Sequence, residues 1–139
     1  MNEQADQVWA SMLTVVTHNL EGYRRLVSDE VGLSFSRVRV LRRLSAAPLT
    51  MGGLAEAAGM DAPAASVAVN ELERRGLVAR ATDPANRRVR MVALTAEGRL
   101  MLERVNAVRP VAPPEFEVLG AGELEQLAGI LSRLEEEST

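Results

Sequence analysis

The 139-residue sequence contains no cysteine and no lysine, one histidine, and only four aromatic side chains. Without cysteine the chain can form no disulfide, thiolate metal site or thiol-based redox sensor. A zinc or iron site needs several converging histidine or carboxylate ligands. His18 stands alone, so we expect no metal and no cofactor. No apolar run reaches the roughly 18 residues that a membrane span needs, so we expect no membrane partner.

Two further absences concern targeting and catalysis. The first twelve residues, MNEQADQVWASM, are acidic where a signal peptide is basic, and they lack its compact apolar segment. We therefore expect a cytoplasmic protein. The sequence also shows no nucleophile elbow, and Gly52-Gly53 leads to no Lys-Ser pair of a phosphate-binding loop. We therefore expect that the chain is not an enzyme.

Positive charge is concentrated in the middle of the chain, and every basic residue is an arginine. Residues 34–99 hold 11 arginines and 6 acidic residues, a net charge of +5, whereas residues 1–33 and 100–139 carry net charges of −3 and −5. The planar guanidinium suits phosphates and guanine edges. A basic middle between acidic flanks indicates that only the middle faces a polyanion.

Apolar spacing predicts helices over most of the chain. The second helix is predicted over residues 34–46 and the third from Met51 to Ala58. A fourth helix follows the N-cap Asp61 and ends at Gly76. Only Gly59 and Met60 separate the last two before the cap, which is the spacing of a helix-turn-helix. A long helix over residues 4–28 precedes them, with an apolar stripe of Val8, Met12, Val16, Leu20, Tyr23 and Val27.

The period then changes to that of strands. Residues 77–81 and 89–94 alternate, and the polar segment 82–88 contains Asp-Pro and Asn, which are turn residues. A basic hairpin directly after a helix-turn-helix predicts a winged helix. Thr95 caps a fifth helix towards Val108, and Pro110, Pro113 and Pro114 should bend or split it. The last helix, 121–136, carries a coiled-coil-like seam of Leu124, Leu127, Leu131 and Leu134.

The expected fold is therefore mainly α with a small β-hairpin wing. We divide it into an N-terminal dimerisation helix (1–32), a winged helix-turn-helix DNA-binding domain (33–98) and C-terminal dimerisation helices (99–139). Within the middle part, the strings LTMGGLAEAAGMDAPAASVAVNELERRGLV, DPANRR and VALTAEG occur in order. They closely resemble the MarR (multiple antibiotic resistance regulator) family, strongly over residues 33–98 and loosely elsewhere.

The resemblance implies a homodimer that binds double-stranded DNA as a sequence-specific transcription regulator, in most cases a repressor. The recognition helix would enter a major groove and the wing an adjacent minor groove. The outer helices would interlock with those of the partner. A small anionic or phenolic ligand binding between the DNA-reading and dimer lobes would relieve repression. The usual fifth helix of the family is long and unbroken, so the three prolines are a departure.

The wing arginines are the first candidates for DNA contact. In the family, an arginine at the place of Arg87 or Arg88 enters the minor groove, and a wing acid steadies it. Asp83 is the matching acid, and Asn86 stands where many relatives have a second one. Arg80 and Arg90 lie on the two strands and are expected to face phosphates together. Of the arginines in the second helix, Arg37 is the one we assign to phosphate.

The recognition helix is short of long polar side chains. Ser66 and Asn70 can hydrogen-bond to bases or phosphates, and Ala64 and Ala65 can pack on thymine methyls. Pro63 and Arg74 complete the predicted contact set. The expected result is modest affinity with heavy reliance on the wing and on DNA shape. The alternative is a winged-helix sensor or protein-interaction module whose DNA binding is weakened or lost.

Two residues of the first helix are candidates for the effector. His18 lies near the expected ligand cleft, and histidine is the side chain type that can switch charge near neutral pH. Tyr23, on the same helix, is the second candidate. The alternative for both is ordinary structure: a hydrogen-bonded histidine without a ligand, and core or dimer packing for Tyr23.

Overall fold

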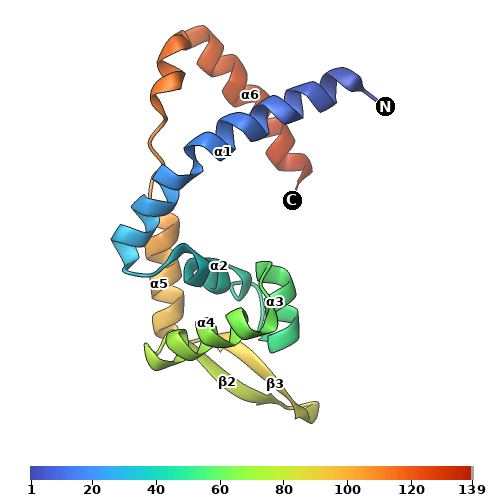
Figure 1. The fold of residues 1–139 in the computed structure, drawn as a ribbon, viewed down its shortest axis with the longest axis vertical. Helices are drawn as coiled ribbons and strands as arrows, with labels where there is room; N and C mark the ends of the chain where they lie inside the picture. The colour runs from blue at the N-terminus through green and yellow to red at the C-terminus, as the bar shows by residue number, and fades with distance from the viewer. Residues whose placement is uncertain (139) are drawn as a thin grey trace.

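The computed structural model describes residues 1–138, and helices dominate it (Figure 1). In chain order the elements are α1 (Glu3–Val31), α2 (Phe35–Arg43), β1 (Leu49–Thr50), α3 (Met51–Ala58), α4 (Ala62–Arg74), β2 (Val78–Asp83), β3 (Asn86–Leu94), α5 (Ala96–Ala107), a 3₁₀ turn η1 (Pro114–Val118) and α6 (Ala121–Glu137). The predicted fold class, mainly helical with a small antiparallel wing, is confirmed.

Side-chain caps fix where the central helices begin. The side chains of Thr50, Asp61 and Thr95 accept hydrogen bonds from the amides of Gly53, Ala64 and Gly98, at 3.0, 2.7 and 3.0 Å. Each bond satisfies an amide that has no partner within its helix. α3 ends at Gly59, whose φ of 65° is a conformation that glycine adopts without strain. The caps thus set the turn between α3 and α4.

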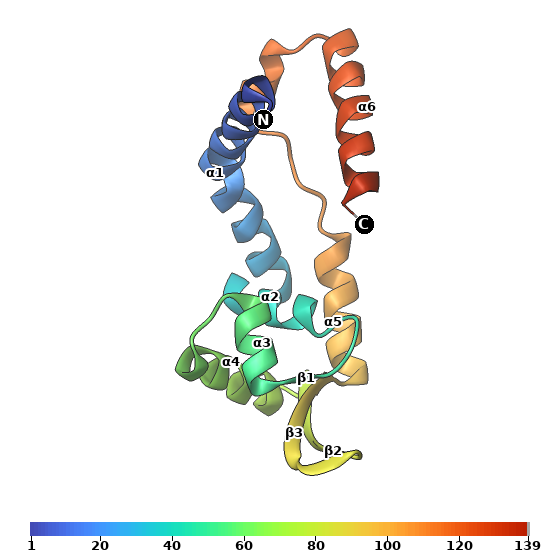
Figure 2. The ribbon, with the colours of Figure 1, turned by 90° about the vertical axis from the view of Figure 1, so that its right-hand side faces the viewer.

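The sheet has the strand order β1-β3-β2, and both pairings are antiparallel. β2 and β3 form the predicted hairpin, which projects from the body as the wing (Figure 2). β1, which the sequence did not predict, pairs Leu49 with Val92 and Thr50 with Met91. The added strand ties the start of α3 to the base of the wing.

The start of α5 lies against the start of the wing. A Cβ atom on Gly98 would stand 2.0 Å from the carbonyl oxygen of Leu77, so only glycine fits at this contact. The hydroxyl of Thr95 donates to the carbonyl of Gly76 on the same chain segment. α5 therefore fixes the base of the hairpin relative to the helix-turn-helix.

The core lies in the winged-helix part and at its junction with α1 and α5. Leu41, Leu54, Leu72 and Val92 are fully buried. α1 reaches this core only with its last turns, where Val27 and Val31 are buried. Tyr23 of the predicted α1 stripe also packs against it, whereas Val8 and Val16, nearer the N-terminus, are 54% and 53% exposed. The core thus holds the helix-turn-helix and wing together and leaves the outer helices largely unburied.

The outer helices extend away from the winged-helix part (Figure 1). α5 ends at Ala107, and an extended connection through Pro110 and Pro113 leads to η1 and α6. The predicted interruption of the fifth helix is confirmed. α6 contributes no buried residue. Among residues 1–138, no helix has both the length and the apolar character to cross a membrane.

Candidate nucleic-acid interface

α4 turns one face into the core and another to solvent. Ala65, Ala68, Val69 and Leu72 are fully buried, at the spacing of one helix face. The opposite, exposed face holds Pro63, Ala64, Val67, Asn70 and Arg74, while Ser66 is half-buried. The prediction that Ala65 contacts DNA is wrong, because the helix turns its side chain into the core. The remaining predicted residues of α4 lie at or beside its exposed face.

The wing carries its arginines at the tip. Asp83 pairs with Asn86, but the preceding residue Thr82 pairs with Arg90, so Arg87 to Val89 form a bulge in β3. Arg87, Arg88 and Arg90 are all exposed. A bulge re-aims side chains away from the strand's regular direction. The hairpin therefore presents three guanidinium groups to solvent within four residues of chain.

The two predicted supports of the wing act on its backbone. The carboxylate of Asp83 accepts a hydrogen bond from the amide of Ala85 at 2.9 Å, and the side-chain oxygen of Asn86 accepts from the amide of Arg88 at 3.1 Å. Within residues 1–138, neither side chain contacts the guanidinium of Arg87 or Arg88. The expectation that Asp83 steadies an arginine side chain is therefore corrected: both residues shape the turn.

Arg80 connects the wing to α4. Its guanidinium donates to Asn70 Oδ1 at 2.8 Å and to Glu73 Oε1 at 3.0 Å, and its side chain is 25% exposed. Antiparallel pairing places Arg90 on the same face of the hairpin, as predicted, because Arg90 pairs with Thr82. Only Arg90 remains exposed there. Two of the Arg80 donors are thus bound within the chain, and its assignment to phosphate stays a prediction.

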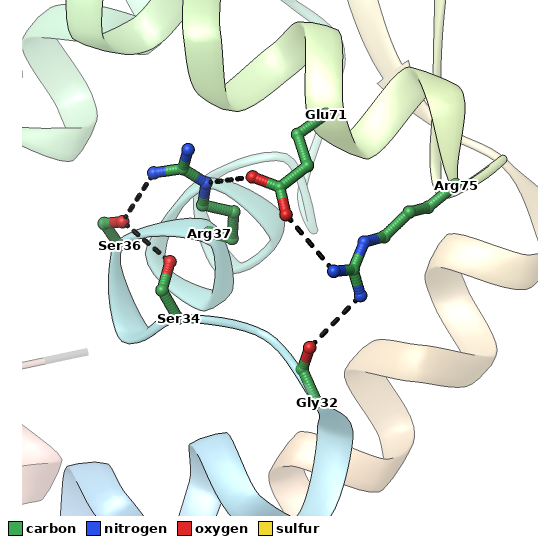
Figure 3. A network of polar contacts seen from close by, with 6 residues as sticks. All are labelled: Gly32, Ser34, Ser36, Arg37, Glu71 and Arg75. Carbon is green, nitrogen blue, oxygen red and sulfur yellow. Dashed lines mark hydrogen bonds and ion pairs between the residues drawn. The ribbon is translucent and has the colours of Figure 1, made fainter.

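Arg37 is also engaged internally (Figure 3). Its Nε donates to Glu71 Oε2 at 2.8 Å, and its Nη1 to the hydroxyl of Ser36 at 3.1 Å. Arg75 binds the other oxygen of Glu71 at 3.2 Å and the carbonyl of Gly32 at 3.1 Å. The hydrogen bond from Arg37, followed by the positive charges around it, lowers the pKa of Glu71. Arg37 thus joins α2 to α4, and its contact with phosphate stays a prediction.

The other three arginines of α2 differ in whether they bind within the chain or face solvent. Arg39 donates to the carbonyl of Ala58 at 3.0 Å, which satisfies the end of α3. Arg42 donates to the hydroxyl of Tyr23 at 2.9 Å. Arg43 alone of the four is exposed. Sequence reasoning could not separate them, because the partners lie on other elements.

The candidate effector residues lie apart from each other. Tyr23 packs edge-on to Phe35, with 6.5 Å between ring centroids. The guanidinium groups of Arg24 and Arg42 lie 5.2 and 5.6 Å from the Phe35 centroid, and the Arg24 Nε is buried without a hydrogen-bond partner. His18 is exposed on α1, five residues and about 140° around the helix from Tyr23. The structure therefore does not bring His18 into this cluster.

One residue of the exposed α4 face is absent from the predicted contact set. Val67 is 58% exposed, whereas its neighbour Ala68 is fully buried. The apolar pattern of this helix allows either Val67 or Ala68 to face inward. The spacing to Leu72 favours Ala68, which lies four residues before it and so on the same helix face. Within residues 1–138 there is also no group of three or more His, Asp or Glu side chains placed to hold a metal ion.

Comparison with known proteins indicates the family to which this chain is similar. A family model described as MarR family matches residues 31–89, which run from the end of α1 into the wing. The structure of a probable transcriptional regulator from Pseudomonas aeruginosa is 30% identical, with a TM-score of 0.63. The match covers 86% of this chain and 93% of that one.

Two further solved structures extend the likeness over nearly the whole chain. The transcriptional regulator BldR from Sulfolobus solfataricus is 27% identical over 96% of this chain and 99% of its own, with a TM-score of 0.63. A mutant of MepR from S. aureus, bound to an oligodeoxyribonucleotide, is 19% identical over 94% of this chain and 98% of its own, with a TM-score of 0.63. The outer helices are therefore included in the shared fold.

Proposed function

This chain belongs to the MarR family of winged-helix transcription regulators, and from that premise we propose that it binds double-stranded DNA sequence-specifically, as a homodimeric repressor. The observation that carries the proposal is the presence of three exposed arginines at the wing tip together with an exposed α4 face that bears Asn70 and Arg74. The likeness to a MepR mutant bound to an oligodeoxyribonucleotide supports it.

The geometry fits the two grooves of duplex DNA. A major groove about 12 Å wide admits one α-helix, and α4 offers Asn70 and Arg74 along its exposed face. A narrow minor groove has an enhanced negative potential that attracts inserted arginines. Arg87 and Arg88, on the bulge at the wing tip, suit that role. Arg90 and Arg43, which are exposed, are then free to contact phosphates.

The homodimer is supported by apolar surface that the single chain leaves uncovered. The first half of α1 exposes Trp9, Leu13 and Val16 at 59%, 45% and 53%. Together with η1 and α6 it lines a largely apolar groove of about 680 Å³. An exposed apolar helix face of this extent is normally covered by another element or by a partner. A second copy, offering the same helices, is the occupant that we propose.

We also propose that a small aromatic anion relieves DNA binding. The supporting observation is the cluster in which Arg24 and Arg42 flank the ring of Phe35 beside Tyr23, with one buried guanidinium nitrogen unpaired. Two cations and an aromatic face would favour a carboxylate attached to a ring. Because the cluster joins α1 to α2, occupancy there can change how the DNA-reading part sits on the dimer helices.

This effector proposal has a direct test. Benzoate is expected to release DNA from the wild-type protein and to do so much less from Arg24→Met. The adjacent, exposed Arg25→Met is the matched control, because it removes the same charge from the same helix. Equal release from all three proteins would contradict the proposed site.

The alternative function is a winged-helix interaction module that has lost DNA binding. The apolar character of the α4 face favours it, since Pro63, Ala64 and Val67 offer no hydrogen bonds from their side chains. The two functions differ in their response to salt. DNA binding through arginines weakens steeply as salt rises, because the duplex releases condensed counterions. Docking of a protein on an apolar face does not depend on salt in this way.

The test of the proposed function begins with duplexes selected by this chain from a randomised pool. Affinity for a selected duplex is then measured by fluorescence anisotropy at two salt concentrations, with wild type, Arg87→Ala and Arg109→Ala. We expect Arg87→Ala to weaken binding about tenfold or more, about 1.4 kcal/mol, and to reduce the salt slope by about 1. Arg109, exposed in the connection after α5, is the charge-matched control and is expected to bind like wild type.

Two results would contradict the proposal. The first is a failure of selection to enrich any sequence. The second is equal binding by Arg87→Ala and Arg109→Ala, which would mean that the wing contributes only net charge.

A further inference from the structure

The orientation of the Asn70 amide is set by Arg80. The two side chains are joined by a hydrogen bond of 2.8 Å between an Arg80 nitrogen and Asn70 Oδ1. A guanidinium can only donate hydrogen bonds, so the amide must present its oxygen to Arg80. The Nδ2 group, which carries two donors, is therefore directed to the other side. Asn70 is exposed, and this donor end is the part available to a ligand of α4.

Arg80 is held in the position that imposes this orientation. Glu73 Oε1 accepts from its Nη1 at 3.0 Å, and β2 fixes its backbone by pairing Arg80 with Val92, which is fully buried. Two anchors on α4 and one on the sheet leave the guanidinium little freedom to turn away. The Asn70 amide is thus preorganised as a donor before any DNA arrives.

An asparagine in this state reads bases differently from a free one. Bidentate recognition of adenine needs the amide oxygen to accept from N6 and the amide nitrogen to donate to N7. With its oxygen directed at Arg80, Asn70 turns its amide donors, rather than its acceptor, away from the wing. Its natural partners in a major groove are the acceptors O4 of thymine, N7 of adenine, and O6 and N7 of guanine.

The neighbouring surface of α4 distinguishes between the bases that carry these acceptors. Val67 lies one helical turn before Asn70 and is 58% exposed, and Ala64 lies one turn further and is also exposed. Neither offers a hydrogen bond, but both present methyl groups. Thymine is the base that combines an acceptor with a methyl group in the major groove.

Building on the proposed DNA-binding function, we propose that Val67, Ala64 and the Arg80-oriented Asn70 form a thymine-reading surface. Val67 and Ala64 pack against C5-methyl groups, and Asn70 donates to a thymine O4. Arg80 acts as a positioning residue, since it selects which end of the amide faces the base. The specificity of the recognition helix is therefore set in part from a wing strand.

The first experiment removes the methyl groups from the DNA. A duplex selected from a randomised pool is remade with deoxyuridine in place of each thymine in turn, which deletes one methyl and leaves base pairing intact. At one or two positions in each half-site we expect affinity to fall about fourfold, the equivalent of one buried methyl group. Val67→Ser is expected to lose that sensitivity, while Thr17→Ser, a control on α1, keeps it.

The second experiment tests the orientation of Asn70. Adenines of the same duplex are replaced by 2-aminopurine, which pairs with thymine but carries no amino group at position 6. Wild type is expected to be indifferent to this change near α4, because the Asn70 oxygen faces Arg80 and not the bases. Arg80→Met fills similar space without donors and frees the Asn70 oxygen, so it is expected to become sensitive. Thermal unfolding of the variant shows whether the winged helix is intact.

The outcomes separate this inference from the function on which it rests. Selective DNA binding with no effect of deoxyuridine overturns the thymine-reading surface and leaves the proposed function standing. Sensitivity of the wild type to 2-aminopurine, or an Arg80→Met variant that matches wild type in a folded state, overturns the role of Arg80. If no duplex is selected, the proposed function fails and this inference fails with it.

Discussion

Glu71 is the residue at which charge contributes most visibly to the fold. The hydrogen bond from Arg37, and then the charges of Arg37, Arg75 and Arg74, lower the pKa of its carboxyl from the ordinary 4.5. A group whose pKa is lower in the folded than in the unfolded state stabilises the fold above its unfolded pKa. That stabilisation disappears as the pH falls through the folded value.

The lowered pKa of Glu71 leads to a prediction for the stability of Glu71→Gln. The variant is expected to be less stable than wild type by a constant amount at neutral pH, and the difference should shrink as the pH falls below about 4.5. Urea unfolding at a series of pH values measures it. In an Arg37→Met background the effect at neutral pH should be smaller, because the main partner is gone. A difference that does not change with pH would contradict the ion pair as its cause.

The surroundings of three predicted contact residues could not be predicted from the sequence: Arg37, Ala65 and Arg80. The wing arginines could be identified because their turn motif is local. Arg37 finds its partner Glu71 34 residues away, and Arg80 finds Asn70 ten residues away on another element. Nothing in a one-dimensional pattern distinguishes an arginine that binds such a partner from one that faces solvent. Ala65 is small enough to be compatible with either face.

Among the elements, the N-caps make the clearest prediction. The Thr95 hydroxyl both accepts from the amide of Gly98 and donates to the carbonyl of Gly76, whereas Thr50 makes only the cap bond to Gly53. Replacing a capping threonine costs about 0.5–2 kcal/mol, and a second lost bond adds about 1 kcal/mol. We expect Thr95→Val to lower stability more than Thr50→Val, as measured by urea unfolding. Equal losses would mean that the Gly76 contact adds nothing.

The elements themselves were largely predictable. α3 occupies the predicted residues because its cap and its C-terminal glycine are both explicit in the sequence. β1 was missed because two residues carry no periodicity, and it exists only through its pairing with β3. The strands run further into the wing than predicted because Asp83 and Asn86 pair across a turn of only Pro84 and Ala85. A polar composition had indicated a longer loop.

For the whole molecule, the decisive question is what covers the outer helices. α1 and α6 both line one groove, yet little of their apolar surface is buried by the rest of the chain. Both helices extend beyond the winged-helix part (Figure 2). Val16 lines that groove from α1. Thr17, its neighbour, shares the polar face of α1 with Asp6 and Glu21, at spacings of 11 and 4 residues.

These two positions give a matched pair of variants. Val16→Asp places a charge in the groove, and burying that charge against a partner is costly, so we expect its dimer to dissociate at micromolar concentrations. Thr17→Asp adds the same charge outside the groove and is expected to stay dimeric. Sedimentation equilibrium measures the association of both variants.

Near-unchanged thermal unfolding of the winged-helix part would show that Val16→Asp acts on association, because α1 joins the core only through its last turns. A monomeric wild type would remove the dimer altogether, and with it the expectation that this chain reads two half-sites related by symmetry.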